Sequence, residues 1–306
     1  MPGEAKALLA AFIWGITAVI LTNLTRRVGS LSLNAARALF GAIFLIAMIP
    51  LSAAGGQIMD MSAKTACSMV ASGIIAFAVG DTFYFLALRN LRASIAVPIA
   101  ESAYPMFTFV IAWIWLRESL SGGLLFGSAL VIGGIVLLTS QRGTPAASEV
   151  GGAVIVEEEV TTGERARWRF GLLAVFLAPL FWAISTVWLK AGSGNLGSEA
   201  ASVMRIVPVA FLLAAVTYRA PPALRRGRYH LVDIVGAAAV GVFGMGVASV
   251  LYVSAIEEAG ASRTAILTAT VPLFALPLAV VFLNEKVTPR VIAGTLVCTA
   301  GIWIVI

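Results

Sequence analysis

Four ionisable residues lie inside long apolar stretches of this sequence, namely Arg37, Asp81, Glu101 and Arg205. If those stretches cross a membrane, each charge lies about five to eight residues inside its helix, or roughly 8–12 Å deep at 1.5 Å per residue. A charge near the centre of a bilayer costs about 2.5 kcal/mol or more, so such residues are functional candidates by default. The chemistry open to them is binding a charged solute or taking up and releasing a proton.

The elements that would hold these charges are apolar runs of about 20 residues, which is the length that crosses a bilayer core. Of the 306 residues, 60% are apolar and 12% are charged, about half the charged share of a typical soluble domain. The alternating pattern of a β-barrel is missing from the sequence, so we expect an all-α integral membrane protein. Ten transmembrane helices are predicted, at residues 6–25, 32–54, 65–88, 94–116, 120–140, 170–190, 197–218, 231–256, 263–283 and 288–306.

The chain also repeats itself at long range. A shift of 168 residues places Trp14 on Trp182, Arg37 on Arg205, and Tyr84 on Tyr252, and a shift of 167 places Pro105 on Pro272 and Glu118 on Glu285. Chance matches of apolar residues are common in such a chain, whereas matches of Trp, Arg, Pro and Glu are not. The sequence therefore predicts a duplication.

The predicted halves are residues 1–140 and 170–306, each with five helices. Residues 141–169 contain Gly151-Gly152 and the acidic run Glu157-Glu158-Glu159, a composition typical of a solvated linker loop. Because five is an odd number, the second repeat enters the membrane inverted relative to the first. Inverted repeats are an architecture that alternating-access transporters use repeatedly.

Basic residues between the predicted helices indicate an orientation. Five Lys and Arg residues fall on the side of the termini and fourteen on the other side, eight of those fourteen in residues 141–169 and 219–230. The positive-inside rule then places both termini on the outer side of the inner (cytoplasmic) membrane. Clusters such as Arg26-Arg27 explain the net charge of +6 by contact with an anionic leaflet, so we expect the lipid bilayer and no nucleic acid as a partner.

Several duplicated motifs resemble a known family. Each half begins with an aromatic-tryptophan element, Phe12 to Gly15 and Phe181 to Ala183. Before the fourth helix, the first half has Ala87-Leu88 followed by Ala93-Ser94, and the second half has Ala255-Ile256 followed by Ala261-Ser262. A longer motif then follows in each half: a proline, an aromatic residue, a Leu-x-Glu element and a glycine-rich last helix. It runs from Pro105 to Gly134 in the first half and from Pro272 to Gly301 in the second. In these motifs the chain resembles the EamA family of the drug/metabolite transporter superfamily.

The resemblance implies a ten-helix carrier for small organic solutes, commonly amino acids or related metabolites, which are often moved outward. One departure concerns the charged residues. The first half carries Gly80-Asp81 and Glu101 where the second half has Ala248-Ser249 and Thr268. The family expectation therefore does not specify the solute.

The four buried charges have two interpretations. The predicted orientation places Arg37, Asp81 and Glu101 nearer the cytoplasmic side, where one arginine would face two carboxylates. The carboxylate in excess could exchange a proton, or the group could be a structural ion pair that joins the second, third and fourth helices. Arg205 comes out near the opposite side with no acidic partner in its own half. It could anchor a substrate carboxylate or phosphate, or it could be a helix-end arginine that reaches the interface.

Prolines and aromatic residues complete the candidate site. Helix breaks are expected at Pro98, Pro105, Pro272 and Pro277, because proline removes a backbone donor and broken helices at matching positions point to a central site. Trp14, Trp182, Tyr84 and Tyr252 could line a cavity or serve in packing. For Glu118 and Glu285, helix capping or local pairing is the favoured role.

The sequence contains no P-loop, dinucleotide fingerprint or cluster of His, Cys and acidic residues, so we predict no enzyme, no cofactor and no metal. The predicted function is a secondary active transporter of small organic solutes by alternating access, with export favoured and protons as the candidate coupling ion. The alternatives are an exchanger of anionic or phosphorylated metabolites or sugars, and a membrane scaffold without transport. Ten helices enclose a pathway on their own, which favours a monomer.

Overall fold

The computed structural model describes residues 1–116, 122–139, 162–220, 230–259, 261–284 and 287–305. Within these residues the chain folds into helices, and no strand occurs among them. The expected positions Glu118 and Glu285 and most of the expected linker lie outside the described residues.

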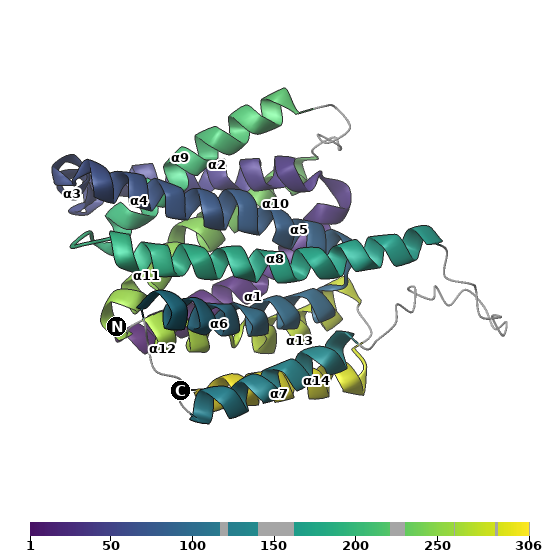
Figure 1. Cartoon of the computed structure of the whole chain (residues 1–306). Coiled ribbons are helices and arrows are strands. Elements are labelled where there is room, and N and C mark those ends of the chain that lie inside the picture. The colour runs from purple at the N-terminus through teal and green to yellow at the C-terminus, as the bar shows by residue number, and fades with distance from the viewer. Residues whose placement is uncertain (117–121, 140–161, 221–229, 260, 285–286, 306) are drawn as a thin grey trace.

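The helices of the first half form a bundle of long apolar segments (Figure 1). They are α1 (Gly3–Arg27), α2 (Ser30–Met48), the short η1 (Ile49–Leu51), α3 (Ala54–Asp60), α4 (Ala63–Gly73), η2 (Ile74–Gly80), α5 (Asp81–Asn90), α6 (Ala93–Leu116) and α7 (Gly122–Thr139). The segments α4, η2 and α5 follow one another without a gap and form one long rod, whose middle part η2 is a π-helix.

The second half has a similar order of elements. They are α8 (Thr162–Gly192), α9 (Ser198–Arg219), α10 (Leu231–Ala239), the π-helix η3 (Val240–Val247), α11 (Ala248–Ala259), α12 (Ala261–Thr268), α13 (Val271–Leu283) and α14 (Pro289–Val305). The π-helices η2 and η3 thus occur at corresponding places in the two halves. A π-helix is rare and is frequently found at functional sites.

Seven helical segments of the described chain are long and apolar enough to cross a membrane, and two shorter apolar helices follow at Val271–Leu283 and Pro289–Ile304. The predicted all-helical membrane class agrees with this. The helix α8 begins at Thr162, so residues 162–169 are helical although the sequence pattern indicated a loop. The outer surface carries large exposed apolar side chains such as Ile43, Ile114 and Phe211, as expected where lipid is the solvent.

The expected proline breaks were wrong at three of the four positions. The chain is helical through Pro98 and Pro105 in α6 and through Pro277 in α13. A membrane helix tolerates proline where neighbouring helices and hydroxyl side chains satisfy the freed backbone groups. Only Pro272 lies at a break, in the first turn of α13, where the missing N–H costs nothing.

Contacts between the halves follow a matched pattern. The helix α2 packs against α9 and α7 against α14, while α1 packs against α11 and α13 in the same way that α8 packs against α5 and α6. Figure 1 shows α7 beside α14 and both chain termini at the same end of the bundle. Each helix of one half is therefore held largely by helices of the other half.

Two glycines allow the closest of these approaches. A Cβ added at Gly73 would lie 2.8 Å from the Cα of Arg205, and a Cβ added at Gly241 would overlap the carbonyl oxygen of Arg37. Glycine at these positions lets backbones meet without an intervening side chain. The two helices that carry the buried arginines, α2 and α9, therefore pack backbone to backbone against helices of the opposite half.

Candidate functional site

An internal cavity lies where the two halves meet. Its volume, open to the centres of water-sized spheres, is about 130 Å³. At about 10–15 Å³ for each water, this is room for a small solute of roughly ten heavy atoms. The lining includes all four buried charges and all four aromatic residues of the predicted site, Arg37, Asp81, Glu101, Arg205, Trp14, Trp182, Tyr84 and Tyr252.

Residues that the long-range repeat pairs with one another line the same cavity. Besides the Trp, Arg and Tyr pairs, the lining contains Asp81 with its counterpart Ser249 and Glu101 with its counterpart Thr268. The π-helices contribute the matched pairs Ala76 with Gly244 and Phe77 with Met245. The two halves therefore supply corresponding positions to one site, and the site differs between halves mainly in its acids.

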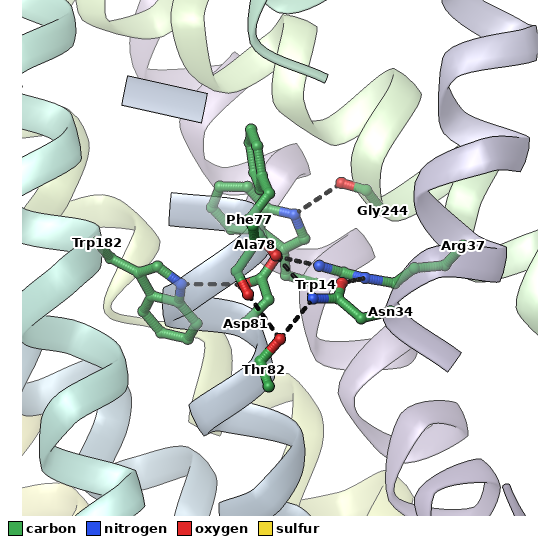
Figure 2. A network of polar contacts seen from close by, with 9 residues as sticks. All are labelled: Trp14, Asn34, Arg37, Phe77, Ala78, Asp81, Thr82, Trp182 and Gly244. Atoms are coloured by element: carbon green, nitrogen blue, oxygen red, sulfur yellow. Dashed lines mark hydrogen bonds and ion pairs between the residues drawn. The ribbon is translucent and has the colours of Figure 1, made fainter. Parts of the chain in front are cut away.

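Asp81 joins three helices at the cavity wall. One carboxylate oxygen, Oδ2, accepts a hydrogen bond from Nη2 of Arg37 in α2 in a buried ion pair. The other oxygen, Oδ1, accepts the indole N–H of Trp182 in α8 at 2.9 Å. Figure 2 shows Arg37 and Trp182 approaching Asp81 from opposite sides. The arrangement fits the structural interpretation of this ion pair.

Side chains also satisfy the carbonyl groups at the end of the π-helix η2. The amide of Asn34 donates to the carbonyl oxygen of Phe77 at 2.7 Å, and the hydroxyl of Thr82 donates to that of Ala78 at 2.6 Å (Figure 2). The π-helix of the second half, η3, has a similar contact: the indole N–H of Trp14 in α1 donates to the carbonyl oxygen of Gly244 at 3.0 Å. Both π-helices are thus held by polar contacts that surround the cavity.

Arg205 has a different set of partners. Its Nε and Nη2 atoms donate to the hydroxyls of Ser72 and Ser185, each at 3.1 Å, and its guanidinium lies 5.0 Å from the ring centroid of Phe77. Among the described residues, no carboxylate pairs with it. Arg205 is buried, with 4% of its surface exposed, so of its two interpretations the helix-end arginine that reaches the interface was wrong. Within the described part of the chain, the cavity therefore contains a cation without a protein counter-ion.

Glu101 is the complementary case. It is 8% exposed and lines the cavity from α6, and within the described part of the chain no basic side chain forms an ion pair with it. The hydroxyl of Tyr84 nearby in the lining is buried and has no hydrogen-bond partner among the described residues. A buried polar group without a partner is costly. Within the described residues, neither Glu101 nor the Tyr84 hydroxyl is therefore committed to a partner.

A hydroxyl cluster forms a further part of the wall, and the sequence patterns missed it. The hydroxyl of Tyr104 is within 2.8 Å of Oγ1 of Thr186 and also hydrogen-bonds to the hydroxyl of Tyr252. Tyr104 has no aromatic counterpart in the second half, since the 167-residue shift places it on Val271. The repeat could not identify it, although its place one turn after Glu101 was a usable signal.

The aromatic rings close the cavity around these polar groups. Trp14 lies against Tyr252 with ring centroids 5.3 Å apart, and Trp182 lies edge-on to Tyr84 at 5.1 Å. Each pair joins one half to the other. The site combines apolar aromatic walls with one cation and one acid that form no ion pair among the described residues.

Apolar helices of bilayer length that surround such a cavity define a multi-pass membrane protein. The family model for EamA-like transporters matches residues 1–140 and 169–306, and the chain belongs to the EamA-like transporter family. A curated relative from Archaeoglobus fulgidus, described as an uncharacterized transporter, is 22% identical over 296 residues, covering 97% of this chain and 95% of the relative. A solved protein structure shares the fold, with a TM-score of 0.69 at 17% identity over 99% of this chain and 95% of that chain.

Proposed function

We propose that this protein is a non-enzymatic secondary transporter that moves small zwitterionic solutes, amino acids or close relatives, by alternating access through ten helices in two inverted repeats. The single observation that carries this proposal is a pair of charges in one small aromatic cavity, Glu101 and Arg205, neither of which has an ion-pair partner among the described residues. The matched contacts between the halves and the two segments that the family model covers support the inverted repeat.

The two charges complement an α-amino acid. A guanidinium binds a carboxylate through two parallel hydrogen bonds, and Arg205 has no protein carboxylate among the described residues that competes for it. Glu101 offers a carboxylate to a solute ammonium. The aromatic walls formed by Trp14, Trp182 and Tyr252 leave space for an apolar side chain and can stabilise the cation through their ring faces.

Glu101 is also the proposed coupling group. An ionised carboxylate without a cationic partner is expensive to bury. In the empty cavity a bound proton would neutralise it, and in the loaded cavity the ammonium group of the solute would do so. Competition between these two cations would couple proton entry to solute exit. Asp81 is not available for this role in the same way, because Arg37 and Trp182 already occupy its oxygens.

The membrane and the direction belong to the proposal. We place the protein in the inner membrane with both termini outside, acting as an exporter and as a monomer. The alternative is an exchanger of anionic or phosphorylated metabolites, which the unpaired guanidinium of Arg205 would also serve.

Reconstitution into liposomes tests the proposal. Pooled labelled amino acids are offered with and without an imposed pH gradient, to the wild type, to Glu101→Gln and to a matched control, Glu199→Gln, whose acid is exposed in the first turn of α9. We expect solute movement that follows the gradient in the wild type and the control, and loss of the gradient effect in Glu101→Gln.

Two results would contradict the proposal. Exchange that ignores the gradient and survives Glu101→Gln, but fails in Arg205→Ala, would favour the anion exchanger. A folded preparation that moves no solute would favour the scaffold without transport.

A further inference from the structure

A second and larger cavity lies away from the central site. It is a groove between α4, α6 and α8 with a volume of about 480 Å³, again open to the centres of water-sized spheres. Its lining is Lys64, Thr65, Ser68, Ile111, Trp115, Ile184, Val187, Trp188, Ala191, Gly192 and Gly194. We call this set the lateral groove.

The lateral groove faces outward, away from the transport cavity. On α8, Trp182 and Thr186 line the central cavity, whereas Ile184, Trp188 and Ala191 line the groove. At 100° per residue these two sets lie on opposite faces of the helix. Trp115 and Trp188 are 68% and 40% exposed, so the groove opens to the surroundings of the bundle, where lipid lies.

The lining changes from polar to apolar along the helix axes. Lys64 and Thr65 stand in the first turn of α4, and Gly192 ends α8. The first turn of α4 and the end of α8 lie at the end of the bundle that carries the chain termini (Figure 1). From Gly192 inward to Ile184 is about 12 Å at 1.5 Å per residue, and Ile111, Trp188 and Ile184 make that depth apolar.

The polar end carries positive charge. Lys64 is exposed and is the charged side chain among the described residues that line the groove. The N-terminus of α4, which continues through η2 and α5, adds the positive end of the helix dipole. A Cβ at Gly192 would overlap the hydroxyl of Ser68, so α4 and α8 meet closely at this end of the groove.

From this charge and polarity we propose that the lateral groove binds an anionic phospholipid. The headgroup phosphate lies against Lys64 and the start of α4, and an acyl chain lies inward along Trp188 and Ile184. Tryptophan is enriched at the level of lipid headgroups, which fits Trp115, one residue before the end of α6. The site is independent of the proposed transport function, because it lies on the outer face of α8.

Native mass spectrometry of the purified full-length protein tests this inference. The protein is titrated with phosphatidylglycerol and, separately, with phosphatidylcholine that has the same acyl chains. One lysine near a membrane surface contributes about fivefold to the binding of an anionic lipid. We expect the wild type to bind phosphatidylglycerol at least about fivefold more tightly, and Lys64→Ala to lose that preference.

Two further variants distinguish this site from general attraction. Lys190→Ala removes an exposed lysine from the last turn of α8, near the same membrane surface but outside the groove lining, and should retain the preference. Ala191→Phe fills the groove without changing charge and should weaken the binding of both lipids.

Three outcomes would overturn the proposal. They are equal binding of the two lipids by the wild type, an equal loss in Lys64→Ala and Lys190→Ala, and competition by glycerol 3-phosphate as strong as by the intact lipid. The last outcome would mean that the acyl chain contributes nothing.

Discussion

Removal of Arg37 from its ion pair with Asp81 tests whether this pair stabilises the bundle. Both side chains are buried, with 8% and 9% of their side-chain surface exposed. Deletion of one partner of a buried pair costs about 3–5 kcal/mol, because the other charge remains buried without compensation. In Arg37→Met, Asp81 keeps the indole N–H of Trp182. We therefore expect a loss at the lower end, about 3 kcal/mol.

The reverse deletion has a similar expected cost. In Asp81→Asn, Arg37 keeps its bond to Oδ1 of Asn34 at 3.2 Å and its position 4.6 Å from the ring centroid of Phe85, but loses its counter-ion. The expected loss is again about 3 kcal/mol. The double variant Arg37→Met/Asp81→Asn leaves no buried charge at this position. Because no uncompensated charge remains, its expected loss is no larger than that of either single variant, about 3 kcal/mol or less, and well below the sum of about 6 kcal/mol.

Reversible unfolding in mixed micelles, followed by circular dichroism, gives the free energies of unfolding for the four proteins of this cycle. The coupling energy expected from the buried pair is about 3 kcal/mol or more. Losses that add to within about 0.5 kcal/mol would refute the reasoning, since they would mean that the two charges do not depend on each other. Gradient-driven transport by a folded double variant would further separate this pair from the coupling role proposed for Glu101.

Three further predictions concern single substitutions, and the first two compare the substitution with a matched control. Gly73→Ala should lower the free energy of unfolding by about 1–3 kcal/mol, because its methyl group would meet the backbone of Arg205. Gly133 has no neighbour within 4 Å of an added Cβ, so Gly133→Ala should raise the free energy of unfolding by about 0.5–1 kcal/mol. Equal effects of the two substitutions would contradict the packing argument. Trp182→Phe should lower the free energy of unfolding by about 1.5–3 kcal/mol, because the indole N–H of Trp182 donates to a carboxylate. Trp14→Phe should lower it by only about 0.5–1.5 kcal/mol, because the indole N–H of Trp14 donates to a neutral carbonyl. Arg205→Lys retains the charge but loses the planar fork, so isothermal titration should show a Kd for the solute raised by about tenfold or more; an unchanged Kd would remove Arg205 from the binding site.

Much of the architecture followed from composition and spacing. Apolar runs of bilayer length force helices, since backbone groups in lipid must be satisfied within their own segment. The repeat identified the aromatic and arginine pairs because Trp, Tyr and Arg are rare enough in an apolar chain for a match to carry information. The local rule for proline failed in α6, which continues through Pro98 and Pro105. A membrane helix can do so where neighbouring groups compensate for the missing donor.

What the sequence by itself determined is which residues are expensive to place in a membrane, and hence which ones require a partner or a ligand. It could not determine how those residues are paired. Arg37 was equally compatible with Asp81 and Glu101 until α2, α5 and α8 were brought together, and only then did Asp81 acquire both Arg37 and Trp182. That choice leaves Glu101 and Arg205 in the cavity without an ion-pair partner in the part of the chain that the structure describes. Pairing depends on distances between helices far apart in the chain, and those distances are set by side-chain packing across the two halves, which no local pattern encodes.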